Sequence, residues 1–568
     1  MLTAAAGLAA AAPAAATNFS VVHITDVHID PFYVTGAIAG GGCYCETHAT
    51  CARMPASCVY TTNSSLQAGP FGEPDFNCAT PPALWEASAA FLAAAHAAAP
   101  AAFVAFTGDF GEAGLSAACG PDVSAQQQIL ANIARAAAGV RAAHPGAPVY
   151  PVFGNHDTSP GDVFDDSSAM SWLYAGVLGS FGADFAGDTR ALADLAFGGW
   201  YSTSVPTLPG LRVCALNANY YAGTNPLIFN SSSAAAAMGR TQLAWLNSTL
   251  AAAAAAGERV WILGHQPPSA WLPDRVEAYR AVLTPFRDVV AVELFGHDHV
   301  DEPQIVRECN APPPPPAPGN GSIDWVRTPG VEWCSGANWP VGNVFGAGLQ
   351  DGDAWCPLVA EADAAAAVRA CEYVCGNVSE ATCRGFTWYP SSPPHGACCM
   401  RSNTDNKPLN ASSDAVCYEK PLAPGGGCGP DSAAYALHVL FAGPSLTEGY
   451  PATNPALRRY EASAADFRVL EAVTYSGNIT RANRDWAFVF GEEYRLAARF
   501  GLPDVGAASL EALVARMAVD GSADWAEFYA LRFKGYAAPE CASGSCKDFV
   551  LALTNGTTPP PGAVSPCP

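Results

Sequence analysis

Residues 292–302 read VELFGHDHVDE, an apolar run that ends in glycine and is followed by two histidines one residue apart. A run of this length and composition, bounded by Gly and Asp, is typical of a buried β-strand. If the segment beyond it is extended, His297 and His299 point to the same side, because side chains alternate along a strand. The two are either ordinary loop histidines or half of a metal site whose other ligands lie far away in the sequence.

Four further apolar runs end in a similar cluster of Gly, Asp, Asn or His, at residues 19–30, 101–112, 147–157 and 259–268. A sixth run, at 211–221, has the same shape and an Asn-rich end. Alanine-rich segments with helical spacing lie between several of them. Strands that alternate with helices predict a layered α/β domain with its functional groups at the carboxyl ends of the strands.

These strand ends supply enough candidate ligands for two metal ions. One ion would take Asp26, His28, Asp109 and His299, and the other Asp109, Asn155, His265 and His297. Mixed nitrogen and oxygen ligands suit zinc, manganese or iron and fit magnesium or calcium poorly. Two adjacent ions bridged by a carboxylate and a hydroxide are a known arrangement for hydrolysing phosphate esters.

Two other histidines have different expected roles. His156, beside Asn155 in the segment FGNHD, remains free for acid–base chemistry. His23, inside the first apolar run, is predicted to be a structural residue rather than a ligand.

Each cluster alone also occurs in ordinary turns and caps, but their order along one chain is specific. The series Asp-x-His, Gly-Asp, Gly-Asn-His-Asp, Gly-His and Gly-His-x-His resembles the signature of the calcineurin-like metallophosphoesterase superfamily. Within it, the chain is similar to the acid sphingomyelinase and sphingomyelinase-like phosphodiesterase family. That similarity rests on HITDVHIDPFY (23–33), GHQPP (264–268), FGHDHVDEP (295–303), the LNANYY segment, and LFAGPSLTEGYPATNPALRRYE (440–461). Later segments, YRLAARFGLPD and FYALRFKGY, also match.

The resemblance implies a four-layer αββα sandwich, two Zn²⁺ ions, and attack of a metal-bridging hydroxide on a phosphodiester. It also implies that His156 protonates the leaving oxygen. Two departures from the family concern its substrates. Because only a short segment precedes residue 23, we expect no built-in saposin domain, which favours the sphingomyelinase-like branch with nucleotide and other small phosphodiesters as substrates. Ala113 stands where the family often has a histidine, which puts a phosphate contact in doubt.

The chain divides into five expected parts. Residues 1–16 read as a signal peptide or as alanine-rich low complexity, and 17–308 as the first part of the catalytic domain. Residues 309–437 form a proline-rich linker and a cysteine-rich insertion that resembles a PAN/apple module, the alternative being an unclassified disulfide-stapled loop. Residues 438–480 return to complete the catalytic domain with strands, and 481–568 are expected to be helical with late disulfides.

The composition bears on the compartment and on the partners. Twenty cysteines, several of them clustered, together with nine Asn-x-Ser/Thr sequons predict a disulfide-bonded glycoprotein that is secreted, extracellular or lysosomal. A net charge of −23 argues against a nucleic-acid polymer as partner. No apolar stretch is long enough for a transmembrane segment.

Three functions fit these observations. The first is a dizinc phosphodiesterase that acts on sphingomyelin or a nucleotide-type diester. The second is a phosphomonoesterase or nucleotide pyrophosphatase that uses the same metal site. The third is an adhesive or recognition protein whose insertion binds a glycan or protein partner.

Overall fold

The computed structural model describes residues 18–31, 33–36, 67–73, 78–111, 125–309, 434–448, 452–536 and 544–557, and short strands between 326 and 419. The expected signal peptide and Ala113 therefore lie outside the described residues. In the described part of the chain, no helix combines the length and the apolar character that crossing a membrane requires.

The first of two six-stranded sheets joins the start of the chain to its later part. Strands β1, β2 and β3 are parallel, and three antiparallel strands from the later part extend the sheet beyond β1. Its spatial order is β20 (Glu492–Arg495), β19 (Val469–Ser476), β18 (Ala456–Ala462), β1 (Phe19–Ile24), β2 (Phe103–Phe106) and β3 (Val149–Pro151).

The second sheet has a parallel centre with an antiparallel strand at each edge. Its order is β4 (Tyr201–Ser204), β5 (Leu211–Ala215), β6 (Arg259–Leu263), β7 (Val290–Phe295), β17 (Ala434–Ala442) and β8 (Glu302–Cys309). β17 begins inside the range 309–437 that was assigned to the insertion. It pairs with β8 as far as Cys309, so the two ends of the insertion lie side by side.

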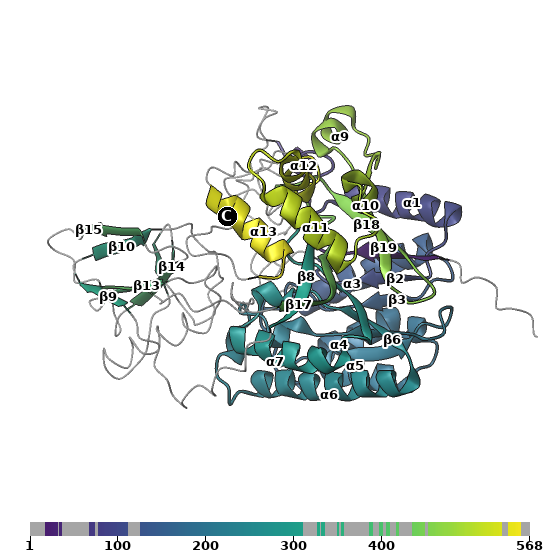
Figure 1. Ribbon diagram of the computed structural model, residues 1–568, viewed down its shortest axis with the longest axis horizontal. Coiled ribbons are helices and arrows are strands. Elements are labelled where there is room, and N and C mark those ends of the chain that lie inside the picture. The colour runs from purple at the N-terminus through teal and green to yellow at the C-terminus, as the bar shows by residue number, and fades with distance from the viewer. Residues whose placement is uncertain are drawn as a thin grey trace, which may run out of the picture.

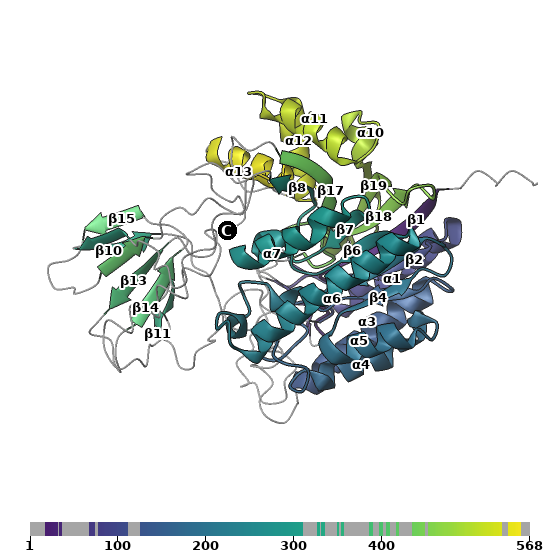
Figure 2. The same ribbon diagram turned by 60° about the horizontal axis from the view of Figure 1, so that its bottom comes forward.

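Buried aromatic rings hold the two sheets face to face. The ring centroids of Phe103 in β2 and Trp261 in β6 are 5.5 Å apart, and those of Phe441 and Tyr460 are 5.1 Å apart. Helices cover the outer sides (Figures 1 and 2). The main ones in this half of the chain are α1 (Pro82–Ala98), α3 (Ala125–Ala143), α4 (Ser171–Phe181), α5 (Thr189–Gly198), α6 (Ala234–Ala256) and α7 (Pro273–Leu283).

Short 3₁₀ helices occupy several connections: η3 (Gly182–Phe185), η4 (Ala218–Tyr220), η5 (Pro226–Ile228), η6 (Pro268–Ala270) and η7 (Thr284–Phe286). The predicted α/β class, with two mixed sheets and covering helices, is confirmed.

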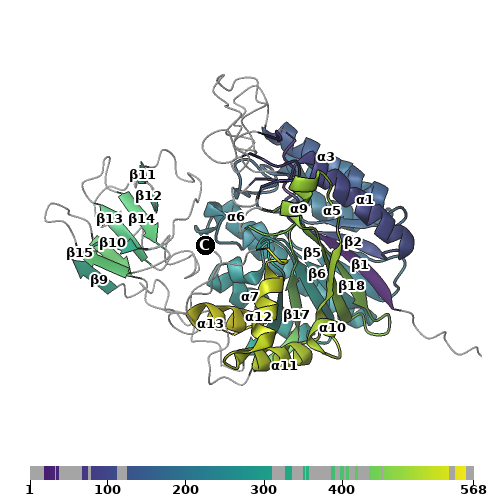
Figure 3. The ribbon, with the colours of Figure 1, turned by 90° about the horizontal axis from the view of Figure 1, so that it is seen from above.

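The later part of the chain is less helical than expected. It contains α9 (Ile479–Asp485), α10 (Leu496–Phe500), α11 (Ala507–Ala518), α12 (Ala523–Arg532) and α13 (Gly544–Thr554). The range 481–568 also contains β20, because pairing with β19 overrides the helical spacing of the surrounding sequence. α11 contacts β17 and α13 contacts β8, so these helices pack on the second sheet (Figure 3).

The insertion contributes strands that join neither large sheet. Four of them form a sheet in the order β14 (Ala397–Arg401), β13 (Gly385–Tyr389), β16 (Val416–Glu419) and β9 (Val326–Pro329). Two further pairs are β10 (Val331–Ser335) with β15 (Asp405–Pro408), and β11 (Leu349–Asp351) with β12 (Ala354–Cys356). The cysteine pairing predicted for this module lies outside the described side chains. Elsewhere, Cys78 and Cys546 each take part in a disulfide bond. Cys214 is a buried free thiol.

Candidate metal centre

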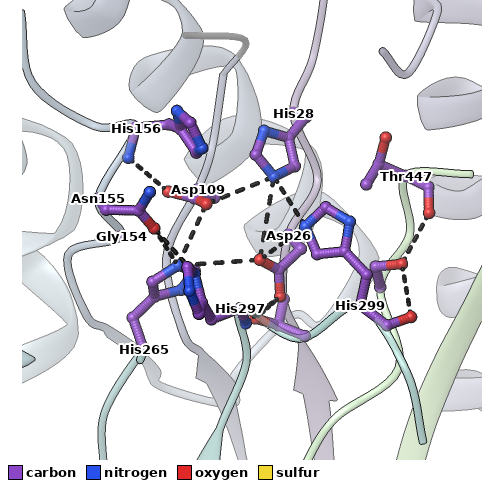
Figure 4. Close-up of polar contacts among 12 residues, drawn as sticks. Asp26, His28, Asp109, Gly154, Asn155, His156, His265, His297, His299 and Thr447 are labelled. Carbon is purple, nitrogen blue, oxygen red and sulfur yellow. Dashed lines mark hydrogen bonds and ion pairs between the residues drawn. The ribbon is translucent and has the colours of Figure 1, made fainter. Parts of the chain in front are cut away.

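The predicted ligands come together at the carboxyl ends of strands from both sheets (Figure 4). They follow β1, β2 and β3 in the first sheet, and β6 and β7 in the second. The residues are Asp26, His28, Asp109, Asn155, His265, His297 and His299.

The backbone at five of the seven ligands is left-handed rather than extended. β1 ends at Ile24, and Asp26 and His28 have φ angles of 50° and 45°. His297 and His299, beyond the end of β7, have φ angles of 74° and 56°, and Asp109 has 53°. The expectation that His297 and His299 point to one side because their segment is extended is therefore wrong. Tight turns bring the side chains together, and such strained conformations, costing about 1–3 kcal/mol each, cluster at functional sites.

One group of side chains surrounds the Asp26 carboxylate. His299 Nε2 lies 3.3 Å from Asp26 Oδ1 and 3.2 Å from His28 Nε2. His28 Nε2 lies 3.4 Å from Asp109 Oδ2, so Asp109 borders this group. These four residues are the set predicted for the first ion.

A second group lies on the other side of Asp109. His265 Nε2 is 3.1 Å from Asp109 Oδ2 and 2.9 Å from Asn155 Oδ1, and His297 Nδ1 is 3.1 Å from the same Asn155 oxygen. Asp26 Oδ1 is also 3.8 Å from His265 Nε2. Asp109 thus touches both groups, as a bridging ligand would, and Asp26 lies close behind it.

The two aspartates each use one carboxylate oxygen for support and leave the other facing the histidines. Asp26 Oδ2 accepts hydrogen bonds from Thr25 Oγ1 at 2.7 Å and from the His297 backbone N–H at 2.9 Å. Asp109 Oδ1 accepts the His156 backbone N–H at 2.8 Å. The other oxygens, Asp26 Oδ1 and Asp109 Oδ2, are buried and accept no hydrogen bond from the described residues. Because buried anionic oxygens without partners are costly, this arrangement fits cations held between them.

The pKa shifts agree with a cation site. Burial lowers the pKa of His28 and of His297 to about 3, so both imidazoles are neutral and keep a lone pair for coordination. Burial alone would raise the pKa of Asp26, but positive charge on the His299 and His265 imidazoles outweighs it and lowers that pKa, so the carboxylate stays ionised. Burial would lower the pKa of His265, but the Asp109 and Asp26 carboxylates outweigh it and raise that pKa to about 10, so positive charge is favoured beside the two aspartates.

Supporting hydrogen bonds fix the orientation of two ligands. His265 Nδ1 donates to the Thr107 carbonyl at 2.7 Å, which leaves Nε2 to face the centre. The Asn155 side-chain amide donates to Asp162 Oδ1 at 2.9 Å, which turns Asn155 Oδ1 inward. Sequence reasoning missed Asp162, because nothing in its local sequence distinguishes it from any loop aspartate.

A third aspartate, Asp157, locks two ligand loops together. Its carboxylate accepts backbone N–H bonds from Asp109 at 3.0 Å, Phe110 at 2.8 Å and Gly154 at 2.7 Å. The loops approach so closely that a Cβ on Gly154 would lie 1.9 Å from Asp109 Oδ1. Asp157 belongs to the quoted FGNHD segment, but only the structure shows that it is a support.

His156 lies beside the ligands without being one. Its ring centroid is 5.3 Å from that of His28, and its side chain is only partly buried. His23 is buried elsewhere, with Nε2 2.8 Å from Thr107 Oγ1, and takes no part in the centre.

Comparison with known proteins finds two family models that match, one for the first part of the chain and one for its later part. Residues 19–301 match the family model of the calcineurin-like phosphoesterases, and residues 442–555 match that of the acid sphingomyelin phosphodiesterase C-terminal region.

Individual relatives match over parts of their length. Human sphingomyelin phosphodiesterase is 34% identical over 164 residues, which is 28% of this chain and 25% of that protein. Sphingomyelinase phosphodiesterase C of Dictyostelium discoideum is 26% identical over 291 residues, 49% of this chain and 57% of that protein. Human cyclic GMP-AMP phosphodiesterase SMPDL3A is 27% identical over 301 residues, 51% of this chain and 59% of that protein. The aligned part therefore spans between a quarter and about three fifths of these relatives. The chain belongs to the calcineurin-like metallophosphoesterases and carries the C-terminal region of the acid sphingomyelinases.

Proposed function

We propose that this protein is a dizinc phosphodiesterase of the acid sphingomyelinase-like type, secreted or lysosomal. The observation that carries the proposal is the pair of buried carboxylate oxygens, Asp26 Oδ1 and Asp109 Oδ2, that face imidazole nitrogens instead of accepting supporting hydrogen bonds. Zinc is preferred because the surrounding ligands mix imidazole nitrogen with carboxylate and amide oxygen. The disulfides of Cys78 and Cys546 support an oxidising compartment.

Each group of side chains has a distinct proposed role. One ion would be held by Asp26, His28 and His299. The other would be held by Asn155, His265 and His297, and Asp109 would be a ligand of both. When bound, the two ions would activate a water molecule as the nucleophile and neutralise the phosphoryl oxygens. His156, half-buried beside this centre, would donate the proton that the leaving alkoxide needs.

The substrate class is proposed from the relatives. Their names specify sphingomyelin and cyclic GMP-AMP, which are both phosphodiesters. We propose a diester with a lipid head group or a nucleotide as substrate.

The test is a substrate panel with the full-length protein after zinc has been restored. It comprises bis-p-nitrophenyl phosphate, sphingomyelin, a cyclic dinucleotide and the monoester p-nitrophenyl phosphate. We expect diester turnover that Asp109→Asn abolishes and that the exposed matched control Asp288→Asn retains. Failure on every diester would refute the proposal, and a clear preference for the monoester would favour a phosphomonoesterase with the same centre.

The role of His156 is tested separately. We expect His156→Ala to lower kcat by about 10²–10⁴-fold, the range typical of a lost general acid, while the zinc content stays unchanged. The loss should be smaller with p-nitrophenolate, which leaves easily, than with an alkoxide leaving group. Equal losses on both substrates would contradict a proton donated to the leaving oxygen.

A further inference from the structure

The Gly-His-x-His motif and the segment after it are held by three buried basic side chains from the C-terminal region. Arg458 forms an ion pair with Asp301, and Arg532 with Glu302, its Nε lying 3.0 Å from Glu302 Oε2. All four residues are at most 4% exposed. These pairs fix the chain directly beyond His299.

The third side chain, Lys534, differs because its amino group contacts two backbone carbonyls and a hydroxyl rather than a carboxylate. Among the described residues it forms no ion pair, and its Nζ lies 3.0 Å from the His299 carbonyl oxygen, 3.3 Å from the Ser445 carbonyl oxygen and 3.0 Å from Ser445 Oγ. An ammonium group has three protons, so these three acceptors use all of them. Lys534 is only 2% exposed. Burying an ammonium group costs free energy, and burial lowers the pKa of Lys534 to about 7, so it is the hydrogen-bonded position of Nζ rather than its charge that defines the contact.

Ser445 extends the contact to the loop that carries Asp26. Its Oγ donates to the Thr447 carbonyl oxygen at 2.7 Å, and the Thr447 N–H donates to the Asp26 carbonyl at 2.9 Å. The neighbouring Leu446 N–H donates to the Thr25 carbonyl at 3.2 Å. Lys534 therefore connects the backbone of His299 with that of Asp26 through one short segment, and Figure 4 shows Thr447 on the same side of the centre as His299.

The connected residues are those with strained backbone. Asp26 and His299 have positive φ angles, and Lys534 itself has φ 56°. A non-glycine residue keeps such a conformation only when its surroundings over-determine it. The hydrogen bonds from Lys534 and Ser445 supply that constraint on one side of the centre. On the other side, Asp157 and Asp162 hold Gly154 and Asn155.

We infer that Lys534 and Ser445 form a clamp that positions Asp26 and His299 for the ion they share with His28. Lys534 is a positioning residue and touches neither ion nor substrate. The inference rests on the proposed metal centre, and it predicts unequal effects on the two ions. Loss of the clamp should weaken the ion held by Asp26, His28 and His299 far more than the ion held by Asn155, His265 and His297.

The test measures zinc content by mass spectrometry after equilibration with graded concentrations of a chelator. Lys534→Met keeps the length of the side chain and removes its donors. We expect one ion to be lost at a chelator concentration about tenfold or more below that needed for the wild type, with the other ion retained. The matched control is Lys547→Met, because Lys547 also donates to two backbone carbonyls but is only partly buried and belongs to α13. It should behave as the wild type.

Double variants identify the weakened ion. In a His265→Ala background, Lys534→Met should remove the remaining zinc, whereas in a His28→Ala background it should remove no more. Equal weakening of both ions, or none, would overturn the clamp. If Lys534→Met does not fold, Ser445→Ala decides, since it removes one hydroxyl from the same connection. A wild-type protein that binds no zinc would instead refute the metal centre itself.

Discussion

At the scale of single residues, the two histidines that follow β7 have separate partners. His297 Nδ1 faces Asn155, whereas His299 Nε2 faces Asp26 and His28. We therefore expect His297→Ala and His299→Ala to deplete different ions, each leaving about one zinc per chain by mass spectrometry. Combining His299→Ala with His28→Ala should cost no further zinc, whereas combining it with His265→Ala should remove the second. Complete loss in either single variant would show that the two ions bind as one unit.

Sequence motifs could identify these ligands, because each follows a recognisable apolar run. They could not show how the ligand side chains are brought together, since hydrogen bonds from Thr447 and Lys534 hold the left-handed turns at Asp26 and His299. The supporting role of Asp162 could not be predicted from the sequence for a similar reason. Its role depends on facing Asn155 across a loop, and no spacing encodes that contact.

Glu448 gives the protein a predicted pH dependence of stability. It is fully buried, and burial raises its pKa well above the ordinary value for glutamate. The folded state then keeps a proton that the unfolded chain releases above about pH 4.3, so the free energy of unfolding decreases as pH rises from there. Glu448→Gln should remove this decrease. Urea unfolding at pH 4.5 and 7 should show the variant gaining stability relative to the wild type only at pH 7.

A matched control is available on α1, where Glu86 is exposed. Glu86→Gln should leave the pH dependence unchanged. A Glu448→Gln variant that is less stable than the wild type at both pH values would show that the carboxyl group, ionised, makes a favourable interaction in the folded state.

At the scale of elements, the parallel strands were predictable and the short C-terminal ones were not. The runs at 19–30 and 259–268 are apolar and bounded by Gly or Asp, so sequence alone indicates strands. β20 instead reads Glu-Glu-Tyr-Arg, and it is a strand because β19 offers an unpaired edge. Local propensity is too weak to decide such a four-residue segment.

The junction of β20 and α10 depends on a distant carboxylate. Glu471 in β19 accepts the backbone N–H groups of Ala497 at 2.8 Å and Ala498 at 3.2 Å, at the start of α10. Charge-assisted caps of this kind stabilise a helix start, so Glu471→Ala should lower the free energy of unfolding by about 1–3 kcal/mol. Urea unfolding measures this, with Glu86→Ala on α1 as the exposed control, and zinc content should not change. A decrease in Glu471→Ala no larger than in the control would show that water replaces the cap.

At the scale of the whole molecule, the chain between β8 and β17 leaves one sheet and re-enters it at adjacent residues. β8 ends at Cys309 and β17 begins at Ala434, and these two residues are register partners in an antiparallel pair. The chain thus leaves the second sheet and returns to it at one point on its edge. A sequence reading places the insertion between two apolar strands but cannot show that its ends adjoin, because strand pairing is a non-local property.

This adjacency predicts the result of an excision. Residues 310–433 would be replaced by Asn-Gly, which favours the two-residue turn of a β-hairpin, and Cys309 would be changed to Ser. Because no predicted ligand lies in the removed range, the shortened protein should keep its zinc content and its turnover of bis-p-nitrophenyl phosphate. Any glycan or protein binding by the insertion should disappear. A folded, shortened protein that has lost its zinc would show that the insertion supports the metal centre. If the protein folds only with a longer Gly-Ser linker, zinc content and turnover of that version test the same prediction.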